Sequence, residues 1–355
     1  MSQRDHDLLG PGCSNLPTSF DVAALAHVSQ TTVSRALRGD TCISTATRER
    51  VARAAERLGY IPDTRGIRLR QSSVGTIAVV LLFPDGGNRK SLNPFYYEIV
   101  SAVEAAAASR NVAILLSGQS DLASLRGDFE RRREADGVIV IGAAANRKAW
   151  NFFAQLRRGG ANIVSWGSPD DELPTIRSDN LEAGRLAAEH LISTGCRRLA
   201  FIGPGWQMQK AFRLRRDGFL LELERHGLPD CSLEVAAAAG DRHEQGEAAI
   251  ERLLAAGSGL DGVFAASDAL AAGAMNGLIR KGRRIPDDVA VVGVDGSSNA
   301  RHSVPPLTTI EQDVALAGQQ LIDAILERHS DPERHVKRFV PVRLVVRESS
   351  RSRQT

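Results

Sequence analysis

Four polar side chains within six residues have the chemistry needed to read the edges of DNA bases: Gln30, Thr31, Ser34 and Arg35. Arginine can bridge O6 and N7 of guanine, glutamine can pair with N6 and N7 of adenine, and threonine can contact thymine. Val33 and Leu37 are four residues apart, so a helix over this stretch would turn both inward and leave the polar set largely outward. Such an arrangement is typical of a recognition helix, whose polar start reaches base edges while its apolar back holds a partner helix.

Three short helices are predicted to hold these residues in place. Each follows a hydroxyl side chain that can cap its free backbone N–H groups: Thr18 before a helix through Ala26, Ser29 before residues 30–38, and Ser44 before residues 45–58. Asp21 can complete a capping box with Thr18. Gly39 and Gly59 are expected to end the second and third helices.

The positive charge of the chain is concentrated around these helices. The 355 residues carry a net charge of only +3, yet residues 19–72 contain nine arginines against five acidic residues. The rest of the chain is therefore close to neutral, at about −1. A local positive field on a helical segment favours contact with nucleic acid over a merely solvated helix face.

The same segment resembles the DNA-binding head of the lactose and galactose repressor (LacI/GalR) family. The resemblance lies in VAALAHVSQTTVSRALRG and ISTATRERVARAAERLGYIPD. It implies that Gln30, Thr31 and Arg35 read bases. It also implies a hinge over residues 62–73 that becomes helical on operator DNA and inserts Leu69 into the minor groove. The full set of expected DNA-binding residues is Thr18, Ser29, Gln30, Thr31, Thr32, Ser34, Arg35, Cys42, Tyr60, Gly66 and Leu69.

Two residues depart from the family pattern in this region. His27 occupies the turn where glycine is usual, and histidine tolerates positive φ better than most residues. Gly66 replaces a usual alanine in the hinge and costs about 1 kcal/mol inside a helix. We therefore expect a hinge that is harder to order than is usual in the family. A simple flexible linker is the alternative for this segment.

The remainder of the chain alternates short aliphatic runs with helical stretches. Strands are predicted at 76–83, 112–117, 137–141, 162–166, 198–202, 262–265 and 290–294, and helices at 96–109, 181–194, 210–226, 245–256, 268–281 and 313–328. Continuous apolar strands between helices indicate doubly wound parallel sheets. The length favours two α/β lobes, similar to periplasmic binding proteins, behind a small all-α helix-turn-helix head.

Polar and aromatic residues follow several predicted strands, where ligands bind in such folds. Phe95 and Tyr96 come after the first strand, and Asp268 and Asp295 follow two later strands. A carboxylate can accept a pair of sugar hydroxyls, and an aromatic ring can cover the apolar face of a sugar. Asp268 could instead merely cap the helix that follows it.

The family resemblance extends over almost the whole chain through NPFYYEIV, DGVIVIG, SDNLEAGRLAAEHLISTGCRRLAFIGP, RLRRDGF, SDALAAGAMNGLIRKGRRIPDDVAVVGVDG and PPLTTIEQD. It implies an effector site, to which we add the aromatic residue that ends the fourth predicted strand; the expected site is Phe95, Tyr96, Trp166, Arg215, Asp268, Asp295 and Gln312. Gly167 and Gly296 stand where the family often has aspartate, which leaves the identity of the ligand open.

Residues 240–246 (GDRHEQG) lack an aromatic that is often found there. Arg242 and His243 in this stretch allow two interpretations. They could bring positive charge to the mouth of the cleft and favour a phosphorylated or acidic sugar. The simpler expectation is that they are exposed charges on a loop.

Other classes of protein fit poorly. The sequence has no GxGxxG after the first strand, no phosphate-binding loop, no GxSxG elbow and no histidine pair at metal spacing, so we expect no enzyme activity, catalytic residue, cofactor or metal. The four cysteines have no paired spacing and are expected to be reduced thiols. No signal peptide or membrane-spanning run is recognisable. An exported sugar-binding receptor, the main alternative, shares the lobes but lacks a DNA-reading head.

The sequence thus predicts a cytoplasmic transcriptional regulator, most simply a repressor. Its expected partners are a pseudo-palindromic double-stranded operator, a small-molecule effector such as a sugar or sugar phosphate, and a second copy of the chain. The C-terminal end has no apolar heptads, which argues against a coiled-coil tetramer. The expected parts are a leader (1–17), the head (18–61), the hinge (62–73), lobe 1 (74–178 and 309–338), lobe 2 (179–308 and 339–348) and a tail (349–355).

Overall fold

The structure is a computed structural model that describes residues 17–61, 73–84, 92–204, 209–229, 233–235, 240–257 and 259–350. The chain divides into two compact units, residues 1–73 and residues 74–355. The expected hinge residues 62–72, with Gly66 and Leu69, lie outside the described residues, as do residues 1–16 of the leader.

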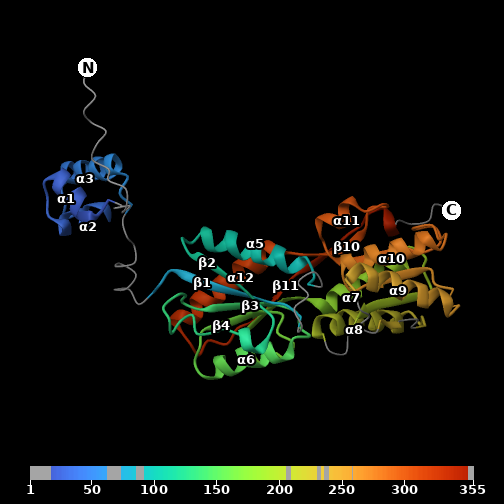
Figure 1. The fold of residues 1–355 in the computed structure, drawn as a ribbon. Coiled ribbons are helices and arrows are strands. Elements are labelled where there is room, and N and C mark those ends of the chain that lie inside the picture. Colours follow the sequence, from blue (N-terminus) through green and yellow to red (C-terminus); the bar gives the residue numbers. More distant parts are fainter. Residues whose placement is uncertain are drawn as a thin grey trace, which may run out of the picture. The chain divides into compact units, whose positions relative to one another are not determined.

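The first unit contains the three predicted helices, α1 (Ser19–Ala26), α2 (Gln30–Leu37) and α3 (Thr45–Leu58) (Figure 1). Their small core is built from Val22, Ala26, Val33 and Val51, all almost fully buried. These residues lie on the inward faces of three different helices. The head is therefore held together by the apolar spacing seen in the sequence.

The predicted caps of the head are confirmed. Thr18 and Asp21 form a reciprocal capping box, and Ser29 and Ser44 each accept a backbone N–H of the helix that follows. His27 has a φ of 50°, in the left-handed region, and its backbone N–H is bonded to Ala23 and Ala24 carbonyls as the helix ends. A glycine would adopt this conformation without strain, so His27 carries a modest backbone cost here.

Six described strands form the first sheet of the second unit, in the order β11-β5-β4-β3-β1-β2, with parallel pairing throughout. The strands are β1 (Thr76–Leu82), β2 (Ala113–Gln119), β3 (Val138–Gly142), β4 (Ile163–Trp166), β5 (Thr175–Ser178) and β11 (Lys337–Val340). Helices α5 (Phe95–Ala108) and α12 (Val314–Ser330) cover one face and α6 (Arg147–Arg158) the other (Figure 1).

The alternation of side chains along β1 explains why both faces are covered. Ile77 and Val79 pack in one apolar cluster with residues of α5 and α12. Ala78 and Val80 point the opposite way and pack with Phe153 of α6. A strand that is apolar on both sides needs helices on both faces, which is the doubly wound arrangement.

Six described strands form the second sheet, in the order β12-β10-β9-β8-β6-β7. They are β6 (Leu199–Pro204), β7 (Leu233–Val235), β8 (Gly262–Ala265), β9 (Ala290–Asp295), β10 (Thr308–Gln312) and β12 (Val342–Val345), and only β12 runs antiparallel to its neighbour among them. Helices α7 (Asn180–Ser193), α8 (Lys210–Arg225), α9 (Arg242–Ala255) and α10 (Asp268–Arg280) pack around this sheet, and the short α11 (Ser298–His302) follows β9.

The chain passes between the two sheets after β5, after β10 and after β11. The predicted lobe boundary at residue 309 is wrong, because β10 pairs with β9 in the second sheet and the crossing comes only before α12. The boundary at 338 also moves, since β11 pairs with β5 through Val340. These boundaries depend on strand pairing, which a short apolar run does not specify.

The predicted tail, residues 349–355, starts too early. A short 3₁₀ helix, Glu348–Ser350, covers its first two residues, and the other 3₁₀ helix of the described chain is Leu122–Ser124. Ser349 and Ser350 are fully buried, and the Ser349 hydroxyl donates to the Val291 carbonyl at 2.6 Å. The second lobe therefore extends at least to Ser350.

All seven predicted strands and all six predicted helices of this unit exist, with small shifts at most ends. The elements not predicted are β5, β7, β10, β11, β12, α6 and α11. Several of these strands carry charged or polar residues, such as Arg177 in β5 and Lys337 in β11, so they show no continuous apolar run. Helix α6 was missed although Trp150, Phe153 and Ala154 follow a helical apolar spacing.

None of the helices that the structure describes is long and apolar enough to span a bilayer.

Candidate functional site

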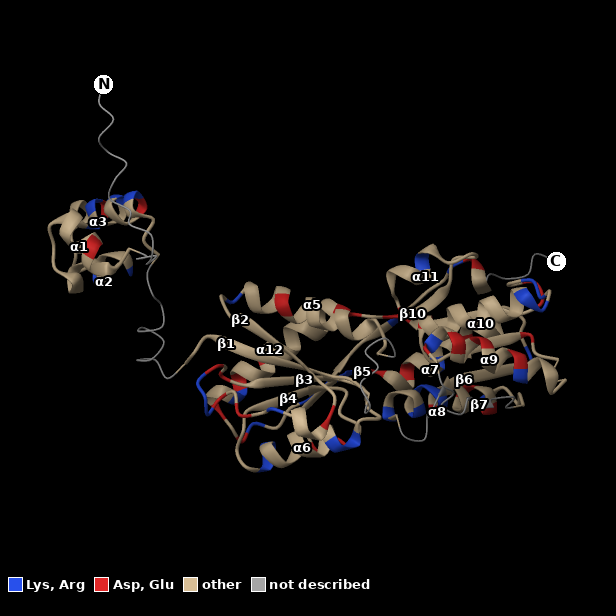
Figure 2. Cartoon of the chain, in the orientation of Figure 1, with Lys and Arg blue, Asp and Glu red and all other residues tan. Residues whose placement is uncertain are grey.

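The outer face of α2 presents the polar residues predicted to read DNA. Gln30, Thr31 and Arg35 are exposed and Ser34 is half-buried, while Val33 and Ala36 lie in the core. Figure 2 shows further basic residues along α3. The head therefore offers one exposed polar helix face on a positively charged unit, as major-groove reading requires.

Hydroxyl groups at the start of α2 form a connected cluster. The Ser29 hydroxyl lies 2.7 Å from the Thr31 hydroxyl and 2.8 Å from the Thr32 hydroxyl, and it accepts the Thr32 backbone N–H at 3.1 Å. The Gln30 amide nitrogen donates to the Ser19 hydroxyl at 3.1 Å. These bonds order the first turn of α2 and orient Gln30 and Thr31 before any DNA is bound.

Arg35 is held by an ion pair within the head. Its Nε donates to Asp40 at 2.8 Å, and Asp40 also accepts the backbone N–H of Cys42 at 2.9 Å. The hydrogen bond from Arg35 lowers the pKa of Asp40 to about 2. The hydrogen bond to Asp40 uses Nε rather than the terminal amino groups that would bridge a guanine.

The other predicted head residues have varied surroundings. Thr18 is committed to its capping box, Cys42 is an exposed free thiol, and Tyr60 is half-buried against the small core. Because Thr18 and Tyr60 have clear structural roles, any DNA contact they make would be additional to these roles.

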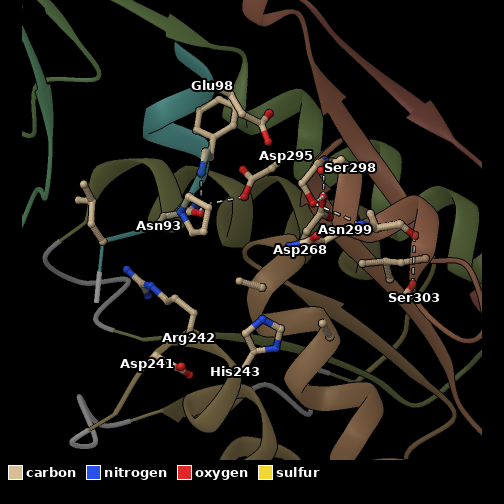
Figure 3. A pocket seen from close by; sticks show the side chains of 18 residues that line it. Asn93, Glu98, Asp241, Arg242, His243, Asp268, Asp295, Ser298, Asn299 and Ser303 are labelled. Carbon is tan, nitrogen blue, oxygen red and sulfur yellow. Dashed lines mark hydrogen bonds between the residues drawn. The ribbon is translucent and has the colours of Figure 1, made fainter. Parts of the chain in front are cut away.

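A cavity of about 220 Å³ and a neighbouring one of about 60 Å³ are lined from both lobes of the second unit. They lie beyond the carboxyl ends of β4, β8 and β9 and at the start of α5. Figure 3 shows the larger cavity. Phe95 lines both cavities, and Tyr96 and Trp166 line the smaller one. The ring of Phe95 lies 6.2 Å from that of Trp166 and 6.3 Å from that of Tyr96.

Asp295 is the centre of a buried polar group at the end of β9. Its carboxylate accepts the Asn93 amide at 3.1 Å and the Gln312 amide at 2.8 Å, and Arg215 lies 4.0 Å away. Its φ of 131° is rare for a residue with a side chain, so the turn holds Asp295 in a strained conformation. Three segments far apart in the sequence thus direct polar atoms to one point.

Asp268 does not cap α10 as the simple alternative supposed, because Ser267 accepts the helix N–H. One Asp268 oxygen accepts the Ser297 N–H at 2.8 Å and its hydroxyl at 2.9 Å, and the other accepts the Thr309 hydroxyl at 2.6 Å. Asp268 therefore ties the start of α10 to the loop after β9 and to β10, at the wall of the larger cavity.

The two carboxyl groups are electrostatically costly where they lie. Burial raises the pKa of Asp268, and the charge of Asp295 raises it further. Burial also raises the pKa of Asp295, although the Arg215 guanidinium opposes this. A buried carboxylate with spare lone pairs gains from a ligand that donates hydroxyl protons to it.

Arg215 is already committed to protein partners. Its Nε donates to Asn180 at 2.8 Å, and its Nη1 donates to the Ala266 carbonyl. The backbone around it is crowded: a Cβ on Gly218 would collide with the Leu181 carbonyl of α7. Gly218 lets α8 approach α7 closely, which sets Arg215 at the cleft.

Comparison with known proteins decides the family. The family model described as bacterial regulatory proteins, lacI family, matches residues 20–63, and the model of a periplasmic binding protein-like domain matches residues 188–350. The transcriptional regulator CelR of Thermobifida fusca is 34% identical over 94% of this chain and 98% of its own length.

The chain belongs to the LacI family.

Further relatives agree with this assignment. The transcriptional repressor CytR of Escherichia coli K12 is 30% identical over 94% of this chain and 96% of its own. A solved CelR–cellobiose complex has a TM-score of 0.64 at 31% identity and covers 94% of this chain and 99% of that one. The lac repressor dimer bound to operator shares the fold at 24% identity and a TM-score of 0.74, and the match covers 94% of this chain and 99% of that one.

Membership of the LacI family makes the chain a DNA-binding transcriptional regulator with a small-molecule effector domain, not an enzyme. The alternative of a sugar receptor without a DNA role is excluded, because the head is matched as well as the lobes. The predicted two-part fold, an all-α head with a two-lobed α/β domain, is confirmed.

The preferred expectation for Arg242 in this LacI-family chain is wrong. Arg242 is not an exposed loop charge, because α9 begins at Arg242 rather than at the predicted Gln245. Asp241 and Glu244 form a capping box that starts the helix early, and their spacing was visible in the sequence. Arg242 lines both cavities, and its guanidinium lies 5.1 Å from the centre of the Phe212 ring. His243 is exposed but also lines the larger cavity.

The structure brings the seven expected effector residues to one region and adds others. All seven line one or both cavities. Lining residues that were not among the predicted site residues include Asn93, Arg177, Asn180, Lys210, Phe212 and Ser297. Asn93 begins the NPFY stretch and lies two residues before Phe95, which was a usable signal. Phe212 and Lys210 had no such sequence signal, because their positions at the cleft depend on how α8 packs in the folded domain.

Proposed function

We propose that this regulator is a carbohydrate-responsive repressor that acts as a homodimer on a pseudo-palindromic operator in the cytoplasm. In this proposal Gln30, Thr31 and Arg35 read the operator bases. The neighbouring hydroxyl residues Ser29, Thr32 and Ser34 contact phosphates. Two heads related by a two-fold axis would meet two half-sites, because operator symmetry mirrors protein symmetry.

The observation that carries the effector class is the make-up of the cleft. The aromatic rings of Phe95 and Trp166 stand beside a polar cluster centred on Asp295. Aromatic faces suit the C–H face of a sugar ring, and carboxylate, amide and hydroxyl groups suit its hydroxyls. The relative CelR, solved with cellobiose, supports the same class.

Effector control follows from the position of this cleft between the lobes. A sugar that contacts residues of both lobes binds one lobe arrangement better than another and shifts the balance between them. The size of the shift equals the difference in affinity for the two arrangements. We propose that this shift alters the spacing of the two hinges and hence the affinity for the operator.

The test measures sugar binding and operator binding on the same full-length protein. A panel of mono- and disaccharides that includes cellobiose is screened by thermal unfolding, where a ligand at 100 times its dissociation constant adds about 2.7 kcal/mol. A stabilising sugar is then expected to change operator affinity.

Asp295→Asn keeps the shape of the side chain but removes its charge, and is expected to abolish the sugar response while operator binding without sugar persists. Protein that binds operator DNA but is neither stabilised nor altered by any sugar would refute the proposed effector class.

A further inference from the structure

The smaller cavity is unusually basic. Among the described residues that line it, Arg177, Lys210, Arg215 and Arg242 are basic, and Asp295 is acidic. A neutral sugar needs no such excess of positive charge. The excess therefore raises the question of which of these cations is free to meet a ligand.

Three of the four cations already have anionic partners. Arg215 lies by Asp295, 4.0 Å away. Arg177 and Lys210 share the single carboxylate of Asp171, which Lys210 contacts at 2.5 Å and Lys337 approaches to 3.5 Å. One carboxylate thus faces three cations, which leaves this rim of the cavity positive.

Arg242 differs from the other cations. Within the described part of the chain, no hydrogen bond or ion pair engages its guanidinium, which rests on the Phe212 ring at 5.1 Å from the ring centre. Arg215 lies over the same ring at 5.7 Å. Stacking on Phe212 fixes the plane of the Arg242 guanidinium while leaving its five N–H donors available.

The surroundings of Arg242 make a positive charge without an anionic partner energetically costly. Burial lowers the pKa of Arg242, and the nearby positive charge of Arg215 acts in the same direction, while Tyr96 and the charge of Asp295 oppose this shift. Burial and the charges of Arg177 and Lys337 likewise lower the pKa of Lys210. An anion at this point would relieve both the desolvation and the mutual repulsion of the cations.

The two ends of the cleft therefore have different chemistry. Figure 3 places Arg242 and His243, together with Asp241, whose carboxylate caps α9, on one side of the larger cavity and Asn93, Glu98 and Asp295 across from them. The acidic side suits hydroxyl groups, and the Arg242 side suits an oxyanion, which a planar guanidinium can hold through two parallel hydrogen bonds.

We propose that the effector is an anionic carbohydrate whose carboxylate or phosphate group binds Arg242, with Arg177 and Lys210 supplying further positive charge. The proposal rests on the carbohydrate class proposed above and narrows it to sugar acids or sugar phosphates. Arg242 is in this view the residue that selects the charged sugar over its neutral counterpart.

The experiment compares matched probes on the full-length protein by thermal unfolding and calorimetry. Glucose, glucuronate and glucose 6-phosphate share one ring, and cellobiose and cellobiouronate, which is oxidised at C6 and keeps both rings, provide a disaccharide pair. At least one anionic probe is expected to bind more tightly than its neutral partner, with affinity that falls as salt rises. Preference for glucuronate or cellobiouronate identifies a carboxylate, and preference for glucose 6-phosphate a phosphate.

Two variants assign the preference to Arg242. Arg242→Gln is expected to weaken the preferred anionic probe about 10- to 100-fold, the range of a charge-assisted hydrogen bond, and to change neutral probes little. Arg242→Lys should restore part of the loss. Arg252→Gln removes the same charge from an exposed position in the last turn of α9 and should change neither affinity.

The outcomes separate this proposal from the broader one. If neutral sugars bind as tightly as anionic ones, or if Arg242→Gln weakens both equally, Arg242 only packs on Phe212 and the anionic effector is refuted while the carbohydrate effector stands. If no probe of either kind stabilises the protein or changes operator binding, both proposals fail.

Discussion

At the scale of single residues, an arginine–aspartate ion pair stands at the centre of each functional region. Arg35 is paired with Asp40 in the head, and Arg215 with Asp295 in the cleft. The first pair is exposed and contributes little to stability, so DNA can displace or share it at small cost. The second is buried, and breaking it would leave an uncompensated charge. Arg35 is thus suited to exchange partners and Arg215 to hold its neighbours in place.

Arg35→Ala tests the base-reading role. We expect a loss of about 1 to 3 kcal/mol on the preferred operator and a relaxed sequence preference, because a bidentate contact to guanine is removed. Binding is measured by titration on the operator and on single-base variants of it. Arg38→Ala is the matched control, since Arg38 is exposed at the C-terminal cap of α2 and donates to the Ser34 carbonyl. Equal losses on every DNA sequence would make Arg35 a phosphate contact.

At the scale of elements, the caps show how local sequence sets function. Ser29 starts α2 and, through its hydroxyl, also orients Thr31 and Thr32. Asp241 and Glu244 start α9 at Arg242 and so point that side chain into the cleft. A capping residue thus decides both where a helix begins and which side chain stands in its first turn.

The hinge provides a test at the same scale. Gly66→Ala should tighten operator binding by about 1 kcal/mol, because alanine lowers the cost of forming a helix in the hinge. The effect should vanish with DNA that lacks the operator, where no ordered hinge is expected. Unchanged or weaker operator binding would show that the hinge does not need to become helical at this position.

At the scale of the whole molecule, the buried carboxyls make the stability of the effector domain depend on pH. A carboxyl whose pKa is raised above its ordinary 3.8 binds more protons in the folded than in the unfolded protein over the interval between the two values. The stability it contributes is present below the unfolded pKa and is lost as pH rises through the folded one.

Asp268→Asn isolates this effect in melting curves at a series of pH values. The variant should be less stable than the parent chain near about pH 4, because it loses acceptor bonds. The difference in free energy of unfolding between the two proteins should become smaller toward about pH 7. Each kcal/mol of change corresponds to about 2–4 °C in melting temperature. Asp288→Asn is the control: hydrogen bonds from Arg284 lower the pKa of Asp288, so its effect should not narrow over this range. A constant gap for Asp268→Asn would contradict the raised pKa.

The sequence by itself determined the head, the class of the two lobes and most of the cleft. The caps Thr18, Ser29 and Ser44 and the polar face of α2 are local features, because helix starts and helix faces depend on residues within a few positions of each other. The apolar strands and the polar residues at their ends are also local patterns, which is why Asp268 and Asp295 were found at the site.

Only the tertiary structure decided which strands belong to which lobe and which charges meet in the cleft. The placement of β10 in the second sheet and of β11 in the first depends on pairing across more than one crossing of the chain. The stacking of Arg242 on Phe212 joins two helices, α8 and α9, that no sequence spacing relates. Long-range contacts of this kind follow from packing and burial, so the stacking of Arg242 on Phe212 could not be read from the local pattern, although the sequence allowed Arg242 at the mouth of the cleft.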